Sequence, residues 1–303
     1  MKPDVVPSSR PFWWGGFASF CAALFFFLSC LLNLAYLSGT AFEVKSPFQE
    51  RTPGTFEKWT ALDVQLLRDL WAYRAISSEL NIAASALITL SFFLLLAAVM
   101  ALADAFEVHG GNASHKASKV LLVPCFVFAA ALAVLELTFN AGAVTTSAWM
   151  YKSWKLDDEQ VKTLELSYVL TQSRGTWLLG MLWFFFGIGL SAALYLNARH
   201  RMLYRSWNVL TAMIVLLCFV GFLSDVARLR WWVVSQAIDL SLTVLVWFLF
   251  MPIWLVWIGV YLISQQAEFT PVPMTGPPRD TGAISGNGAR APYRDEEAEM
   301  SRL

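Results

Sequence analysis

Charged residues are scarce in this chain and make up only 15% of its 303 residues, whereas hydrophobic residues make up 57%. Soluble domains usually carry about 25% charged and about 45–50% apolar residues. The 22 basic and 22 acidic residues balance each other, so no excess of positive charge predicts nucleic acid as a partner. The composition instead indicates that the main partner is a lipid bilayer.

Residues that usually carry cofactors or chemistry are also rare. The four cysteines all lie inside apolar runs, and none forms a CxxC pair: Cys21, Cys30, Cys125 and Cys218. We interpret them as small buried hydrophobic residues, and we expect no disulfide framework, metal site or cofactor. No nucleotide-binding, zinc-protease or hydrolase motif occurs. We therefore expect a non-enzymatic protein, with an intramembrane enzyme as a less favoured alternative.

What the chain does have is six long apolar runs, each close to the roughly 20 residues that cross the hydrocarbon of a bilayer. They predict an all-α, polytopic transmembrane helix bundle, because lipid offers the backbone no hydrogen-bonding partners. We place a tail at 1–15, a transmembrane domain at 16–264 and a disordered tail at 265–303. The expected spans are about 16–37, 82–103, 119–143, 176–197, 207–225 and 238–264.

Three of the spans have further features, and the first of them also has an alternative interpretation. The first run is longer than the apolar core of a signal peptide, about 7–15 residues, but the small residues Ser38–Ala41 keep a cleaved signal peptide as the minor alternative. In the last run, Pro252 predicts a kink. In the fourth run, Gly180, Gly187 and Gly189 predict close packing of helices.

The orientation follows from loop charge. An even number of spans places both termini on one side. Loop 198–206 has three arginines and no acid, against two arginines in 226–237, so the positive-inside rule favours cytoplasmic termini. The glycosylation sequon Asn112-Ala113-Ser114 would favour the reverse orientation.

Both longer loops on the opposite, non-cytoplasmic side carry helical signals. Segment 58–79 has apolar residues at helical spacing with charges between them, Arg74 included, and predicts an amphipathic helix that caps the bundle. Asp157 and Gln160 have the spacing of a capping box, and Leu156 and Val161 that of a hydrophobic staple. We prefer this helix start to a metal site, because adjacent residues on a helix point in different directions.

Polar residues inside membrane spans are costly and often functional. The candidates for ligand binding here are Glu136, Asn140, Asp239 and Asn33. In the expected topology all of them lie toward the non-cytoplasmic side, which predicts a polar pocket open to that side. It argues against a channel or a proton relay, which would need polar groups at several depths.

A structural role for Glu136 is the alternative to ligand binding. The residue could remain protonated and hydrogen-bond to a neighbouring helix, or it could pair with a cation at the same boundary. The available cations are Arg174, Arg228 and Arg230.

The C-terminal tail is rich in proline, glycine and charge. Its last residues, Ser301, Arg302 and Leu303, are similar to a peroxisomal targeting signal and also to a PDZ-domain ligand. Protein partners that bind through this tail are therefore a further hypothesis, with chance similarity as its alternative.

Three segments, Gly175–Leu179, Arg201–Trp207 and Trp254–Leu262, together resemble a group of uncharacterised bacterial six-helix membrane proteins. Tyr204 and Ser206 stand where that group often has proline. The resemblance implies six helices and no known activity. We expect a multi-pass membrane protein that acts as a non-enzymatic accessory or scaffold protein. The alternative is a small-solute or lipid transporter with a pocket around Glu136.

Overall fold

The computed structural model describes residues 12–38, 64–227, 238 and 241–269. The helices in this part of the chain are α1 Phe12–Ser38, α2 Val64–Ile76, α3 Ser78–Ala117, η4 Ser118–Leu122, α4 Val123–Ser153, α5 Asp158–His200, α6 Arg205–Ala227, η5 Thr243–Phe250 and α8 Met251–Phe269. The two η segments are π-helices. No strand occurs among the described residues, so the all-α prediction is confirmed.

Six helical stretches are long and apolar enough to cross a membrane, which confirms the expected number of spans. They are Phe12–Tyr36, Ser78–Glu107, Val120–Ser153, Trp177–Arg199, Arg205–Ala227 and Thr243–Gln265. Several helices extend well beyond the apolar runs. The 43 residues of α5 extend over about 65 Å at 1.5 Å per residue, roughly twice the thickness of the hydrocarbon. Its residues before Trp177 precede the candidate span.

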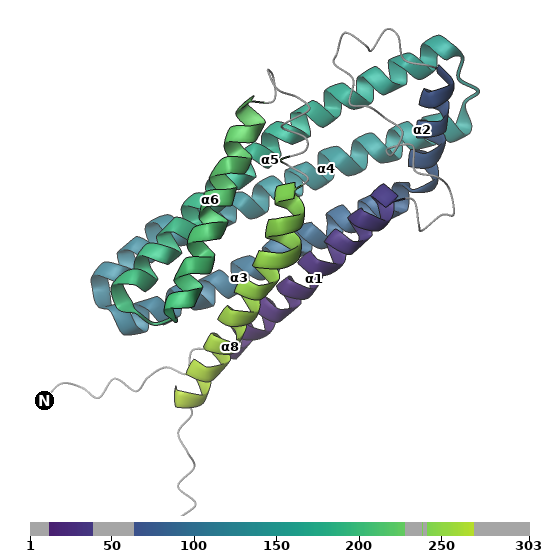
Figure 1. The fold of residues 1–303 in the computed structure, drawn as a ribbon. Coiled ribbons are helices and arrows are strands. Elements are labelled where there is room, and N and C mark those ends of the chain that lie inside the picture. Colours follow the sequence, from purple (N-terminus) through teal and green to yellow (C-terminus); the bar gives the residue numbers. More distant parts are fainter. Residues whose placement is uncertain (1–11, 39–63, 228–237, 239–240, 270–303) are drawn as a thin grey trace, which may run out of the picture. The chain divides into compact units, whose positions relative to one another are not determined.

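The described helices belong to one compact unit, Met1–Thr270. Figure 1 shows which of them lie side by side. α1 lies against α3 and α8, α4 lies between α3 and α5, and α6 packs on α5. Aromatic rings fill the middle of the bundle. The ring of Trp247 stacks on Trp183 and Phe26, with centroids 4.8 and 5.2 Å apart, and meets the edge of Phe92 at 5.4 Å. All four side chains are buried.

α2 packs across α4 and α5 near the turn that joins these two helices. We call this end of the bundle the α2 side. Here a second apolar cluster forms from Leu67, Trp71, Val144, Val161, Leu164 and Tyr168. The described part of the predicted amphipathic segment is thus helical, and it caps two long helices. Its residues 58–63 lie outside the described part.

The predicted helix start in the second loop is confirmed. Asp157 is the N-cap of α5 and forms a capping box with Gln160. The Gln160 amide donates to Asp157 Oδ1 at 2.8 Å, and the Asp157 amide donates to Gln160 Oε1 at 3.1 Å. Of the two residues of the expected staple, Val161 belongs to the apolar cluster and Leu156 packs against it. The helix that starts here continues into the fourth span and is not a separate short segment.

A π-helix precedes Pro252, in the span where a kink is expected. η5 ends at Phe250, and the Met251 amide donates to the Val246 carbonyl five residues earlier. Pro124 follows η4 in the same way, close to the start of α4. Proline has no amide proton to continue an α-helical ladder, and a wider π turn is one way in which a helix accommodates the interruption.

Candidate functional site

The described residues of α4 and α5 enclose two adjoining cavities, which we call together the α4–α5 cleft. The smaller one, the Glu136 cavity, has a volume of about 170 Å³. The larger one, the outer cavity, has about 620 Å³. Phe139, Ala143 and Thr171 line both, so the two cavities are adjacent. Binding pockets for small molecules typically measure about 300–1,000 Å³, and the cleft as a whole lies in that range.

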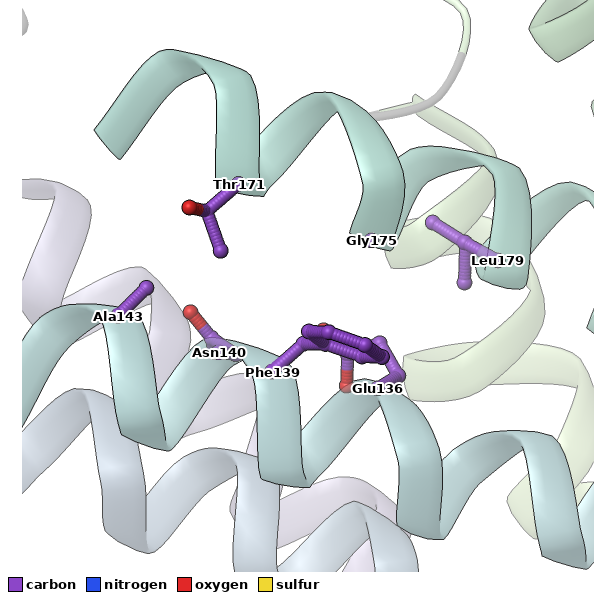
Figure 2. Close-up of a pocket in the computed structure, with 7 residues that line it drawn as sticks. All are labelled: Glu136, Phe139, Asn140, Ala143, Thr171, Gly175 and Leu179. Carbon is purple, nitrogen blue, oxygen red and sulfur yellow. The ribbon is translucent and has the colours of Figure 1, made fainter. Parts of the chain in front are cut away.

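Helical periodicity places three of the residues that line the Glu136 cavity on one face of α4. Glu136, Asn140 and Ala143 follow one another at intervals of four and three residues, and therefore lie on one face of α4. Figure 2 shows this face opposite Thr171 and Gly175 of α5. A Cβ atom added at Gly175 would meet no atom within 4 Å. Glycine thus leaves room at this point, where a larger side chain would occupy the cavity.

Hydrogen bonds to α3 hold the side chain of Asn140 in place. Its amide nitrogen Nδ2 donates to Asn81 Oδ1 at 3.0 Å and to Ser85 Oγ at 2.8 Å. These two bonds use both amide protons. The carboxamide oxygen then points toward α5 and Thr171, as Figure 2 shows. These hydrogen bonds fix the Asn140 carboxamide in the lining of the cavity before any ligand binds.

Glu136 is partly buried and has no charged partner in the described part of the chain. Arg174, one of the partners considered above, is exposed and does not line the cavity. Arg228 and Arg230 lie outside the described residues. An unpaired carboxyl group in a membrane span is costly, which is the reason to consider it as part of a binding site.

Both polar and apolar side chains line the outer cavity. Hydroxyl and amide groups come from Thr138, Thr146, Ser147, Gln160, Thr163 and Ser167. Apolar surface comes from Met150, Trp154, Leu156, Leu164 and Tyr168, together with Phe139. Such a lining suits a molecule with both polar and apolar parts.

The structure brings together two of the four predicted binding residues. Glu136 and Asn140 line the same cavity. Asn33 lies partly buried on α1 and lines neither cavity, so the structure does not group it with them. Asp239 and the terminal residues Ser301, Arg302 and Leu303 lie outside the described residues. In the described part of the chain, no group of three or more histidine, cysteine, aspartate or glutamate side chains could hold a metal ion.

A second polar feature, Arg74 with Glu165, could not be predicted from the sequence pattern. Arg74 Nη1 lies 2.5 Å from Glu165 Oε2, and the side chains are only 6% and 0% exposed. The guanidinium carbon also lies 4.1 Å from the ring centroid of Tyr168 and 4.9 Å from that of Trp71. The sequence pattern of 58–79 places Arg74 among the charges interleaved with the apolar residues, and its burial follows from the packing of α2 on α5.

The pair is part of a larger set of contacts that attaches α2 to its neighbours. Arg68 Nη2 donates to the Leu156 carbonyl at 3.0 Å and to Asp158 Oδ1 at 2.9 Å. The Tyr151 hydroxyl donates to the Arg68 carbonyl at 3.0 Å. The α2 helix thus holds the ends of α4 and α5 together, beside the outer cavity.

Fold and composition define a multi-pass integral membrane protein with six spans. The chain matches no known family model, no curated protein and no solved structure. Any more specific function has to be argued from the cleft and its surroundings.

Proposed function

We propose that this protein is a non-enzymatic accessory protein of the membrane that binds a small solute or a lipid-like molecule in the α4–α5 cleft. The observation that carries the proposal is the Glu136 cavity, where a carboxyl group without a charged partner among the described residues adjoins a larger, partly apolar cavity. Apolar surface supplies binding energy in such sites, and a few placed polar groups supply orientation.

The aromatic core favours binding over conduction. In the middle of the bundle the ring of Trp247 contacts those of Trp183 and Phe92, and each of the three is at most 2% exposed. An aqueous pathway needs polar or charged groups along its length. The cleft instead lies between α4 and α5, which makes it a site on the bundle and not a passage through its centre.

A thermal-shift screen tests the proposal. Purified wild-type protein and Glu136→Gln are heated with metabolites, lipids and ions. A ligand present at 100 times its dissociation constant stabilises the folded state by about 2.7 kcal/mol. We expect at least one compound to stabilise the wild type and to have less effect on Glu136→Gln. The exposed Glu79 on α3 lines neither cavity, and Glu79→Gln is the control for loss of one negative charge.

The variant Gly175→Val tests the space of the cavity and not its charge, because the added side chain occupies the cavity while Glu136 is retained. A Cβ atom at Gly175 meets nothing within 4 Å, so the branch point of the added side chain has room. If a stabilising compound acts equally on wild type, Glu136→Gln and Gly175→Val, it does not bind in the cleft. The proposal would then be wrong for that compound, and wrong altogether if every active compound behaved so.

Transport of the same solute is the second candidate function. It is favoured by the position of Glu136 within the candidate span Val120–Ser153, where a carboxyl group is costly unless it is used. Reconstituted protein would then show saturable uptake into liposomes, and Glu136→Gln would lose uptake while remaining folded. Binding without uptake would support the accessory role alone.

An accessory role also implies a partner protein, for which the C-terminal residues Ser301, Arg302 and Leu303 are the candidate contact. A peptide of the tail and a variant lacking these three residues can be compared in binding to PDZ domains. Equal binding of the tail peptide and of the variant would contradict a role of the last three residues in binding a partner.

A further inference from the structure

We infer that the α4–α5 cleft is a site for an amine-bearing amphiphile, with its ammonium group in the Glu136 cavity and its apolar part in the outer cavity. This inference rests on the proposed binding function and names the class of ligand. It follows from which hydrogen-bonding groups around the Glu136 cavity remain available.

With Glu136 ionised, the described polar side chains that line the cavity all present acceptors. Asn140 donates both of its amide protons to side chains of α3, so that only its oxygen is available to a ligand. The Thr171 hydroxyl donates its single proton to the Ser167 carbonyl at 2.9 Å, which leaves its oxygen lone pairs. An ionised Glu136 is itself an acceptor only.

A cavity that presents acceptors alone selects a ligand that only donates. A primary ammonium group has three donors, no acceptor and one positive charge. It would supply a counter-charge for Glu136, which has none among the described residues, and its protons could reach Asn140 and Thr171. A carboxylate or phosphate group would instead bring further acceptors and a repulsive charge.

The outer cavity explains why the ligand should also have an apolar part. It adjoins the Glu136 cavity at Phe139, Ala143 and Thr171, which line both. Its volume is about 620 Å³, and its lining includes the apolar side chains of Met150 on α4 and Leu164 on α5. A small inorganic cation would leave this space unused. An alkyl or aryl group attached to the amine would fill it and remove apolar surface from water.

Isothermal titration with simple probes tests the ligand class. The full-length protein is placed in nanodiscs of neutral phosphatidylcholine and titrated with octylamine, 1-octanol, octanoate and methylamine, with empty nanodiscs as the baseline. At pH 7 the amines are protonated, as lysine is. We expect octylamine to bind about tenfold or more tightly than 1-octanol, because a charge-assisted hydrogen bond is much stronger than a neutral one. Octanoate and methylamine should bind more weakly still.

The variants locate the binding. Glu136→Gln should reduce octylamine affinity to that of 1-octanol, whereas Glu79→Gln should retain the wild-type difference. Gly175→Val should weaken both octyl compounds. Should Glu136→Gln fail to fold, the comparison of octylamine with 1-octanol in wild type and Gly175→Val still decides the question.

The outcomes separate this inference from the proposed function. Equal binding of octylamine and 1-octanol to the wild type, with both weakened in Gly175→Val, would overturn the amine preference and leave the cleft as a binding site. Equal binding of methylamine and octylamine would show a small-cation site and overturn the amphiphile. Should Gly175→Val alter the binding of no probe, the evidence would count against the inference and against binding of these ligands in the cleft.

Discussion

Arg74 on α2 and Glu165 on α5 form an ion pair that the fold removes almost completely from solvent, with 2.5 Å between Nη1 and Oε2. The rings of Trp71 and Tyr168 cover the guanidinium group. Two charges buried in this way are costly unless each has the other, because the interior cannot solvate them as water does. The pair therefore attaches α2 to α5 in one specific position.

Removing one member of this pair should destabilise the protein strongly. For Glu165→Gln or Arg74→Met we expect a loss of about 3–5 kcal/mol, because the variant breaks a buried ion pair by removing one of its charges. The measurement is the free energy of unfolding in detergent for the single and double variants. The double variant Arg74→Met with Glu165→Leu should lose less than the sum of the single losses.

The exposed pair Arg68–Asp158 is the natural control. Its side chains are 33% and 68% exposed, although the distance of 2.9 Å is also short. We expect Asp158→Asn to cost about 1 kcal/mol or less, because solvent screens exposed pairs. A similar loss at both pairs would contradict the role of burial.

The capping box at the start of α5 predicts a smaller and local effect. Asp157→Ala should lower stability by about 1 kcal/mol, and Asp157→Ser should lower it by less, because serine also caps helices well. Hydrogen exchange of the Gln160 amide is the direct measurement, since this amide donates to Asp157. Glu159→Ala removes an acid from the same turn without removing the cap, and fast exchange in that variant too would argue against the cap.

These two sites show what a sequence can reveal. The capping box could be predicted because Asp157 and Gln160 lie three residues apart, and local geometry decides their contact. Arg74 and Glu165 are separated by 91 residues in the chain, so only the packing of α2 on α5 brings them together. In the sequence each is a single charge in a helical segment, which is typical of a solvent-exposed face.

The same distinction applies to the cleft. Glu136 and Asn140 could be placed together from the sequence because they are four residues apart on one helix. The acceptors and open space contributed by Thr171 and Gly175 depend on how α5 faces α4, which periodicity alone does not determine. Asn33 shares their depth in the expected topology, but α1 packs against α3 and α8. Depth in the membrane therefore predicted only part of the site.

Two glycines of α5 should respond to the same substitution with opposite signs. A Cβ atom at Gly189 would lie 2.8 Å from Cε2 of Phe126, a buried ring, whereas one at Gly175 would meet nothing within 4 Å. We expect Gly189→Ala to destabilise by about 1–3 kcal/mol through overpacking. Gly175→Ala should stabilise by about 0.5–1 kcal/mol, since alanine restricts the unfolded chain. Unfolding free energies that change in the same direction would contradict this difference between core and cleft.

Stability also separates a binding role of Glu136 from a structural one. Because Glu136 has no charged partner in the described part of the chain and an unpaired carboxyl group in a span is costly, we expect Glu136→Gln to leave the unfolding free energy unchanged or to raise it. Asn140→Leu should cost about 1–2 kcal/mol, because two hydrogen bonds to α3 are lost and each such bond in a membrane is worth about 0.6 kcal/mol and at most about 1.7.

Unfolding of both variants in detergent, with Thr138→Val as the control, gives the comparison. The exposed Thr138 hydroxyl donates only within its own helix, to Val134, so its removal should have little effect. If Glu136→Gln instead costs more than Asn140→Leu, the carboxyl group holds the fold together through a partner of its own. The cavity would then lack the available acceptor on which both the proposed binding function and its preference for an amine depend.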